Sequence, residues 1–256
     1  MSFVLLKKMF KQNAVLFWAF VAGIVLYYGL VVLMYPVIAD MMEDMGGIWA
    51  EMFSVGRIDE FAASMLGEIV WMIGLILFIM LVFRLIYKSV DSGSLSMQLM
   101  AGISRKKYIV TSCVYLLLNL FIIFALVLGV GVLIFVALGE DFSFANYLNN
   151  VSLAILALGA VTAISFFLGV ILAGKKAAAG LLIAIPIVLY MLLMASGIHS
   201  SLEFLRWVSV FGWFVPAEIA VGSFELWWLV MIGYMLLIAV VGIVSTLIFR
   251  KKNLSL

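Results

Sequence analysis

Few residues of this 256-residue chain are of the types that perform catalysis, and the chain has a single histidine and a single cysteine. His199 precedes Ser200 and Ser201. We interpret it as a solvated loop histidine, because an adjacent serine alone does not make a nucleophile and base. The lone Cys113 excludes a disulfide framework and a cysteine-based structural zinc site. We therefore expect neither a catalytic residue nor a metal site.

A second candidate is the run 169–176, which nearly matches a phosphate-binding P-loop. That motif requires a preceding strand, and a Ser or Thr after its lysine to hold Mg²⁺. Here Lys176 follows Lys175, and Gly169 lies in an apolar segment. We interpret Gly169 as a site of close helix packing and the lysines as an anchor at the end of that segment. The chain is not expected to hydrolyse ATP.

The most informative polar segment is 87–108. Asp91 or Ser92 could cap a short helix over about 91–102, and Gly102 could end it. Ser104 could then cap the next helix. Leu95, Leu99 and Met100 are expected to line one face of the short helix, while Arg105–Lys107 lie at a membrane interface. Such a helix is either an interfacial connector or a docking element for a cytoplasmic partner.

The composition of the whole chain indicates what kind of structural elements hold the segment 87–108 in position. Hydrophobic residues make up 68% of the chain and charged residues only 11%. A typical globular chain is about 45–50% apolar and about 25% charged. Too few charges are present to solvate the apolar surface of a soluble domain. This excludes a soluble enzyme, a disordered chain and a free nucleic-acid binder, and favours a multi-pass membrane protein.

Apolar segments of the length that a bilayer requires, roughly 20 residues, predict an all-α membrane protein with a single transmembrane domain. Six membrane-spanning helices are expected, at about 15–39, 66–88, 108–138, 151–173, 177–198 and 224–249.

The positions of the charges predict the orientation. Basic residues cluster before the first span, between the second and third, after the fourth and after the sixth. Acidic residues dominate the intervening connections, where Arg57 and Arg206 are the only bases. Because an excess of Lys and Arg marks the cytoplasmic side, both termini are expected in the cytoplasm.

Apart from charges at their rims, the six predicted spans contain no Asp, Glu, Lys, Arg or His. Ion-coupled transporters usually carry such residues inside the membrane as relays. Their absence weighs against a secondary transporter driven by an ion gradient.

Two flanking regions also carry patterned residues. Residues 1–14 predict an amphipathic interfacial helix, either a plain membrane anchor or a force-transmitting element. Its apolar positions are Phe3, Leu6 and Phe10, flanked by Lys7 and Lys11 among others. The region 199–222 is too apolar for a freely solvated loop, and predicts either an outer gate or an interfacial aromatic belt. Its candidate gate residues are Phe204, Trp207, Phe211, Trp213 and Phe214.

The segment 91–106 resembles the type-2 ABC exporter permeases. These proteins carry an acid, a glycine and a leucine, a leucine-rich turn, and then Ile-Ser-Arg and basic residues before the third span. Gly102 departs from the proline that many members have there. The matching positions are Asp91, Gly93, Leu95, Leu99, Ile103, Ser104, Arg105 and Lys106.

This resemblance implies that the matching residues, together with Ser92, form a coupling helix that docks on a separate ATP-binding subunit. ATP and Mg²⁺ would belong to that partner, and this chain itself would hold no cofactor. Two ATPase subunits and a second permease, identical or a sister chain, would complete the transporter. The region 199–222 would hold re-entrant helices that close the pathway from outside.

The function that follows is export of a hydrophobic or amphipathic substrate from the cytoplasm or inner leaflet of a cell membrane, as in bacterial permeases for lantibiotics or phenol-soluble modulins. Peptide is the expected cargo class, by analogy with those permeases. Methionine-rich surfaces adapt to varied shapes and would suit such cargo. Two alternatives remain: a membrane immunity or assembly factor that binds a partner without transport, and a secondary transporter. No nucleic-acid partner is expected.

Overall fold

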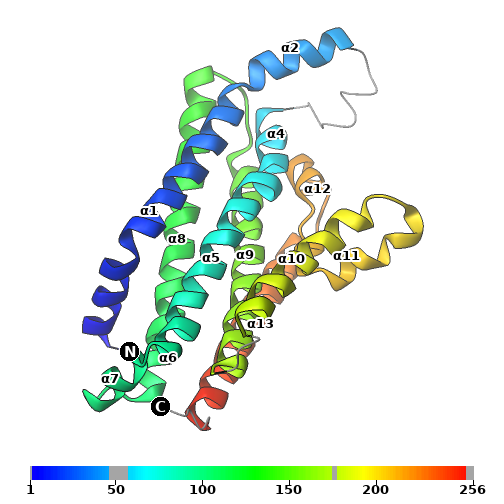
Figure 1. The fold of residues 1–256 in the computed structure, drawn as a ribbon. Helices are drawn as coiled ribbons and strands as arrows, with labels where there is room; N and C mark the ends of the chain where they lie inside the picture. Colours follow the sequence, from blue (N-terminus) through cyan, green and yellow to red (C-terminus); the bar gives the residue numbers. More distant parts are fainter. Residues whose placement is uncertain (1, 46–56, 175–177, 252–256) are drawn as a thin grey trace.

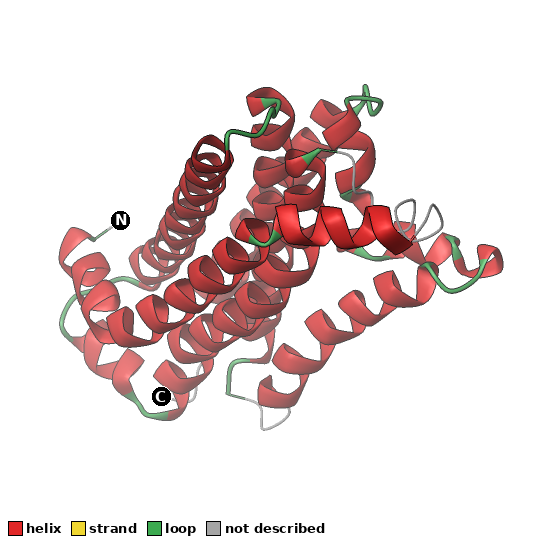
Figure 2. Ribbon diagram, turned by 90° about the horizontal axis from the view of Figure 1, so that it is seen from above, coloured by secondary structure: helices red, strands yellow, loops and turns green. Residues whose placement is uncertain are grey.

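The computed structural model describes residues 2–45, 57–174 and 178–251, and its regular structure within those ranges is helical throughout (Figure 2). Five helices are long and apolar enough to cross a membrane. This agrees with the predicted all-α, multi-pass class. They comprise α1 (Phe3–Leu33), the composite helix Ile58–Asp91, α8 (Arg105–Leu138), α9 (Phe144–Leu172) and α13 (Trp227–Lys251).

The composite helix changes its winding twice along its length. Two π-helical segments interrupt it, each forming i→i+5 turns that are often found at functional sites. The second π-helical segment carries Arg84 and Lys88 at the end of the apolar stretch. Its parts are α4 (Ile58–Met65), η1 (Leu66–Val70), α5 (Trp71–Val82), η2 (Phe83–Lys88) and α6 (Ser89–Asp91).

The predicted fifth span corresponds to α10 (Ala178–Ser196), a helix of 19 residues that contains Pro186. It is shorter than the five long helices, so a sixth crossing stays a prediction. The first predicted span, about 15–39, covers the junction of two helices, because α1 ends at Leu33. After Met34 the chain enters α2 (Tyr35–Met45), which projects from the top of the bundle (Figure 1).

The remaining elements are short and lie at the ends of the long helices (Figure 1). One of them, α7, connects the composite helix to α8, and the rest lie between α10 and α13. Their bounds are α7 (Ser94–Met100), η3 (Ser200–Leu202), α11 (Phe204–Val208), η4 (Val210–Trp213) and α12 (Pro216–Val221).

The bundle therefore has two chemically different ends. The basic end holds the start of α1, the α6–α7 connection, the start of α8 and the end of α13, and both termini lie there (Figure 1). The acidic end holds α2, α4 and the α8–α9 connection. Its charged side chains include Asp59, Glu60, Glu140 and Asp141.

Helix α9 is the centre of the bundle and packs against α13, α5, α8 and α10. Small residues allow this close packing, as the sequence predicts. A Cβ added at Gly159 would lie 3.2 Å from both Ile238 and Leu120. A Cβ at Gly131 of α8 would overlap the hydroxyl of Tyr147, so this glycine is required where α8 meets α9.

Candidate functional site

The N-cap of the short helix α7 is Gly93 rather than Asp91 or Ser92. Gly93 adopts φ 67°, and no side chain caps the helix. Asp91 ends the preceding α6, and the Ser92 hydroxyl donates to the Lys88 carbonyl at 2.7 Å. The prediction of an Asp91 or Ser92 cap is therefore wrong. A left-handed glycine already turns the chain between the two helices, so the polar side chains complete α6 instead.

The other boundary of α7 agrees with the sequence. Gly102 adopts φ 84°, and the Ile103 amide donates to the Gln98 carbonyl at 3.2 Å. Such a left-handed glycine satisfies carbonyls at a helix end. Ser104 caps α8, and its side chain accepts from the Lys107 amide at 3.3 Å. The turn between α7 and α8 is thus fixed by two residues predicted for those roles.

One side of α7 is anchored on the bundle. Leu95 is fully buried, and Leu99 packs against the same core. The buried Tyr108 hydroxyl donates to the Leu85 carbonyl, and its oxygen lies 3.1 Å from the Ser89 hydroxyl. These contacts tie the start of α8 to the η2–α6 segment from which α7 emerges. The position of α7 relative to the long helices is therefore well defined.

The other side of α7 is exposed and apolar. Met97 is 70% exposed and Met100 is 81% exposed. The prediction that Met100 shares the face of Leu95 and Leu99 is therefore wrong. Beside Met100 lies a depression of about 600 Å³. It brings together predicted coupling residues from α7, the turn and α8, and it is lined by Ser96, Leu99, Met100, Ile103, Ser104 and Arg105.

We call this depression together with Met97 the α7 surface. Lys106 is exposed on the first turn of α8, and Asp91 and Ser92 are exposed where α6 ends. None of these three lines the depression. The structure thus gathers about half of the predicted coupling residues into one surface, whereas Leu95 is buried in the core and the others do not line the depression. It adds Ser96 and Met97, which the resemblance did not include.

The predicted interfacial helix is the first part of the continuous helix α1, not a separate element. Its buried positions are Leu5, Leu6, Met9 and Asn13, whereas Phe3 is 75% exposed. The predicted apolar face is thus wrong at Phe3. The side chains that pack against the bundle instead begin at Leu5 and repeat every four residues, at Met9 and Asn13.

The other predicted residues of this segment are one half-buried ring and two exposed lysines. Phe10 is half-buried and meets the Tyr115 ring edge-on, with ring centroids 4.8 Å apart. Lys7 and Lys11 are exposed. Ser2 caps the helix through the Leu5 amide.

The predicted outer-gate residues divide into two groups. Phe211 and Phe214 are buried on both sides of Trp71, with ring centroids 4.7 Å and 5.2 Å from its ring. Trp213 stacks on Tyr234 at 5.5 Å. In contrast, Phe204 and Trp207, on α11, are 60% and 73% exposed. The first group packs against the bundle and the second presents apolar surface outward.

Trp71 is a residue that the sequence did not single out. Its Nε1 donates to the Ala154 carbonyl of α9 at 2.8 Å, deep in the core. Trp71 thus connects α5, α9 and η4. It stands in a uniformly apolar stretch, and nothing in its spacing distinguishes it from the leucines and isoleucines around it.

Tyr35 lies where α2 begins at the acidic end and packs against Phe61, with ring centroids 5.6 Å apart. Burial raises the pKa of Tyr35, and the nearby carboxylates of Glu140, Glu60 and Asp59 raise it further. The phenol is thus held neutral among these carboxylates.

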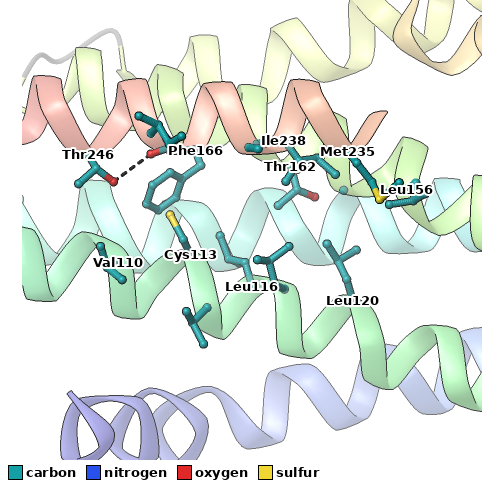
Figure 3. Close-up of a pocket in the computed structure, with 17 residues that line it drawn as sticks. Val110, Cys113, Leu116, Leu120, Leu156, Thr162, Phe166, Met235, Ile238 and Thr246 are labelled. Carbon is teal, nitrogen blue, oxygen red and sulfur yellow. Dashed lines mark hydrogen bonds between the residues drawn. The ribbon is translucent and has the colours of Figure 1, made fainter. Parts of the chain in front are cut away.

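An apolar groove of about 410 Å³ lies on the side of the bundle between α8, α9 and α13 (Figure 3). Cys113 and Phe166 point into it from α8 and α9 (Figure 3). It opens outward, because Leu117, Met235 and Ile243 on its walls are each about half exposed. The two threonine hydroxyls that line the groove already donate hydrogen bonds within their own helices. Thr162 donates to the Leu158 carbonyl, and Thr246 donates to the Gly242 carbonyl. The groove therefore presents a surface suited to apolar groups.

No protein-family profile matches this chain, and a comparison with curated proteins finds no match either. The site must therefore be interpreted from its own chemistry. The methionine, leucine and isoleucine side chains that line the α7 surface and the apolar groove supply neither protons nor nucleophiles. His199 is exposed, and its Nδ1 accepts from the Ser201 amide at 3.1 Å.

Proposed function

We propose that this chain is the permease subunit of an ATP-driven exporter of the ABC type. In this proposal the chain crosses the membrane six times, and the basic end faces the cytoplasm. The observation that carries it is α7. This short helix is anchored through Leu95, while Met97 and Met100 point away from the bundle at its basic end. An apolar surface on a rigidly attached helix is what a cytoplasmic partner needs to transmit movement to the long helices.

The partner would be an ATP-binding subunit that carries ATP and Mg²⁺. Two such subunits and two permeases, identical or sister chains, would form the complete exporter. The energy must come from outside this chain if its spans lack charged relays. The π-helical η2, which lies directly before α6 and α7, would carry movement of α7 into the composite helix.

The substrate would be hydrophobic or amphipathic, and peptide is the favoured class. Support comes from the apolar groove, whose lining residues are uncharged. Together with the exposed aromatic side chains of α11 at the other end, it would offer apolar contacts along a path through or beside the bundle. The buried Phe211 and Phe214 would contribute to closure of that path.

Co-expression with ATP-binding subunits encoded beside this gene, followed by purification in nanodiscs, tests the proposal. We expect a stable complex that hydrolyses ATP, and we expect Met97→Asp with Met100→Asp to abolish both association and hydrolysis. Met41→Asp is the matched control, because Met41 is 60% exposed at the opposite end. If the complex survives the paired α7 changes, α7 is not the coupling element.

Single-cysteine labelling tests the orientation in a Cys113→Ala background. A membrane-impermeant maleimide applied to intact cells should label Glu140→Cys and should not label Met100→Cys. Opening the cells should expose the second site. Labelling of both positions in intact cells would contradict the proposed topology.

The apolar groove also favours a second candidate function, that of an immunity or assembly factor that binds an apolar segment of another protein in the membrane. Its open walls and uncharged lining fit such a segment as well as a transported substrate. The two functions differ in their need for ATP. Two results would identify the chain as an immunity or assembly factor rather than a permease. It would bind its ligand fully without any ATP-binding subunit, and it would confer its phenotype when such subunits are deleted.

A further inference from the structure

A further cavity, of about 860 Å³, lies at the basic end and is lined by residues from the start of α1, the η2–α6 segment, α7 and the start of α8. It is distinct from the α7 surface, although Met97 and Ile103 border both. Its walls are more polar than those of the apolar groove. The cationic side chains that line it come from two elements: Lys8 from α1, and Arg84 and Lys88 from η2.

Within the described ranges these three cations lack counter-charges. The only salt bridge among the described residues joins Arg57 and Asp59, at the other end of the bundle. No acidic side chain is among the residues that line the cavity within the described ranges. One Arg84 nitrogen donates to the Asn13 side-chain oxygen at 3.5 Å, which leaves most of the guanidinium free to bind an anion. The cavity is therefore a site for negative charge.

The wall formed by α6 and α7 also supplies acceptors. The Gln98 side-chain oxygen is buried and has no hydrogen-bond donor among the described residues. The hydroxyls of Ser92 and Ser94 already donate to the carbonyls of Lys88 and Ser89 at 2.7 Å and 3.3 Å, so their oxygens remain only as acceptors. A buried acceptor without a donor is costly. A ligand that fits this cavity must therefore carry hydrogen-bond donors as well as negative charge.

We propose that this cavity binds a phosphate diester or monoester joined to a hydroxyl-bearing alcohol, of the glycerol phosphate type. Lys8, Arg84 and Lys88 would hold the phosphate, and Gln98 would accept from an alcohol hydroxyl. An ammonium-bearing alcohol fits less well, because its charge would lie against three cations. This inference does not depend on the proposed transport function.

The place of the cavity favours a lipid as the source of this group. Arg84 and Lys88 directly follow the apolar stretch of α5, where lipid phosphates lie if that stretch crosses a membrane. Basic pockets between helices at this depth are typical binding sites for anionic headgroups. The same chemistry is present in free glycerol phosphate, so the experiment must separate the two sources.

Binding can be measured by native mass spectrometry of the delipidated protein, with phosphatidylglycerol, phosphatidic acid or phosphatidylcholine added in turn. We expect phosphatidylglycerol to bind most tightly, phosphatidic acid less tightly and phosphatidylcholine least. Glycerol 3-phosphate is the soluble arm. Its failure to displace phosphatidylglycerol identifies a lipid site, and its displacement of the lipid identifies a site for the free phosphate ester. Equal binding of all three lipids, without displacement, overturns the proposal.

Variants test the assigned residues. Arg84→Gln and Lys88→Gln should each weaken phosphatidylglycerol binding about fivefold or more. Lys11→Gln is the matched control. Lys11 is exposed and lies about one helical turn after Lys8 on α1, but it does not line the cavity. Arg84→Lys keeps the charge and should retain most of the binding if Arg84→Gln proves unstable. An equal loss in Lys11→Gln would show diffuse attraction and overturn the site.

Gln98→Leu separates the two parts of the proposal. We expect this variant to lose the preference for phosphatidylglycerol over phosphatidic acid while it still binds both more tightly than phosphatidylcholine. Unchanged preference would show that Gln98 does not contact the alcohol, and the proposed ligand would then be wrong.

Discussion

The two ends of this bundle use polar groups in opposite ways. At the acidic end, one carboxylate is both buried and paired. Asp59 is fully buried, binds Arg57 through two hydrogen bonds of 2.8 Å and 3.0 Å, and accepts from the Ser143 amide at 3.1 Å. At the basic end, Lys8, Arg84 and Lys88 surround a cavity without a carboxylate among the described residues.

Two sets of apolar side chains also differ in exposure between the two halves of the bundle. On the acidic half of the bundle, Trp71 is enclosed by Phe211 and Phe214. At the basic end, Met97 and Met100 are exposed. The acidic half thus pairs Asp59 and packs Trp71 internally. Among the described residues, the basic end leaves three cations without counter-charges, a buried acceptor without a donor and two methionine side chains exposed. Changes on the acidic half should therefore mainly affect stability, and changes at the basic end should mainly affect binding.

The largest stability effect is expected for Gly131→Ala, because the new methyl group would overlap the buried Tyr147 hydroxyl. That hydroxyl is 2.9 Å from the Tyr28 hydroxyl and 3.1 Å from the Val127 carbonyl, so it has no free direction in which to move. We expect a loss of about 3 kcal/mol in the free energy of unfolding. Thermal unfolding in detergent, followed by circular dichroism, measures it.

Gly129→Ala is the matched control two residues away, because a Cβ there meets no atom within 4 Å. It should be neutral or slightly stabilising, since alanine favours helix. Equal destabilisation by both changes would contradict the tight contact at Gly131.

A smaller loss, of about 2 kcal/mol, is expected for Asp59→Ala. It removes the partner of Arg57 and leaves the Ser143 amide at the start of α9 without its acceptor. Arg57 is about half exposed and can be solvated after the change, which limits the loss. Glu60→Ala serves as the control, and it should shift the thermal midpoint much less. Equal shifts would show that Asp59 does not join α4 to α9.

Trp71→Phe should cost about 1 kcal/mol, because it keeps an aromatic ring between Phe211 and Phe214 but loses the hydrogen bond to Ala154. Trp227→Phe is the comparison, since Trp227 is only partly buried at the start of α13. Thermal unfolding in the same detergent measures both variants. A larger loss at Trp227 would mean that the Trp71 cluster does not hold η4 against the bundle.

The sequence predicted the helical class well, because long apolar segments have few alternatives in a membrane. It also predicted the turn at Gly102 and Ser104, where backbone requirements limit the choice of residues. It could not predict the role of Trp71, because in a uniformly apolar segment no spacing marks the residue that faces a neighbour. The exposure of Phe3 and Met100 was missed for a related reason: both lie near helix ends, where tertiary packing decides which face is buried.

The smallest effect on stability is expected at the α7 surface. Met97→Ser with Met100→Ser removes two exposed side chains that contribute little to the packed core. The free energy of unfolding should therefore stay within about 0.5 kcal/mol of that of the unchanged protein. Leu95→Ser is the contrasting variant: Leu95 is fully buried, and its loss should detach α7 and lower the midpoint clearly. Stable methionine variants that no longer associate with an ATP-binding subunit would assign these side chains to binding alone. Methionine variants as unstable as Leu95→Ser would instead place them in the core, and the contrast between the two ends would then fail at α7.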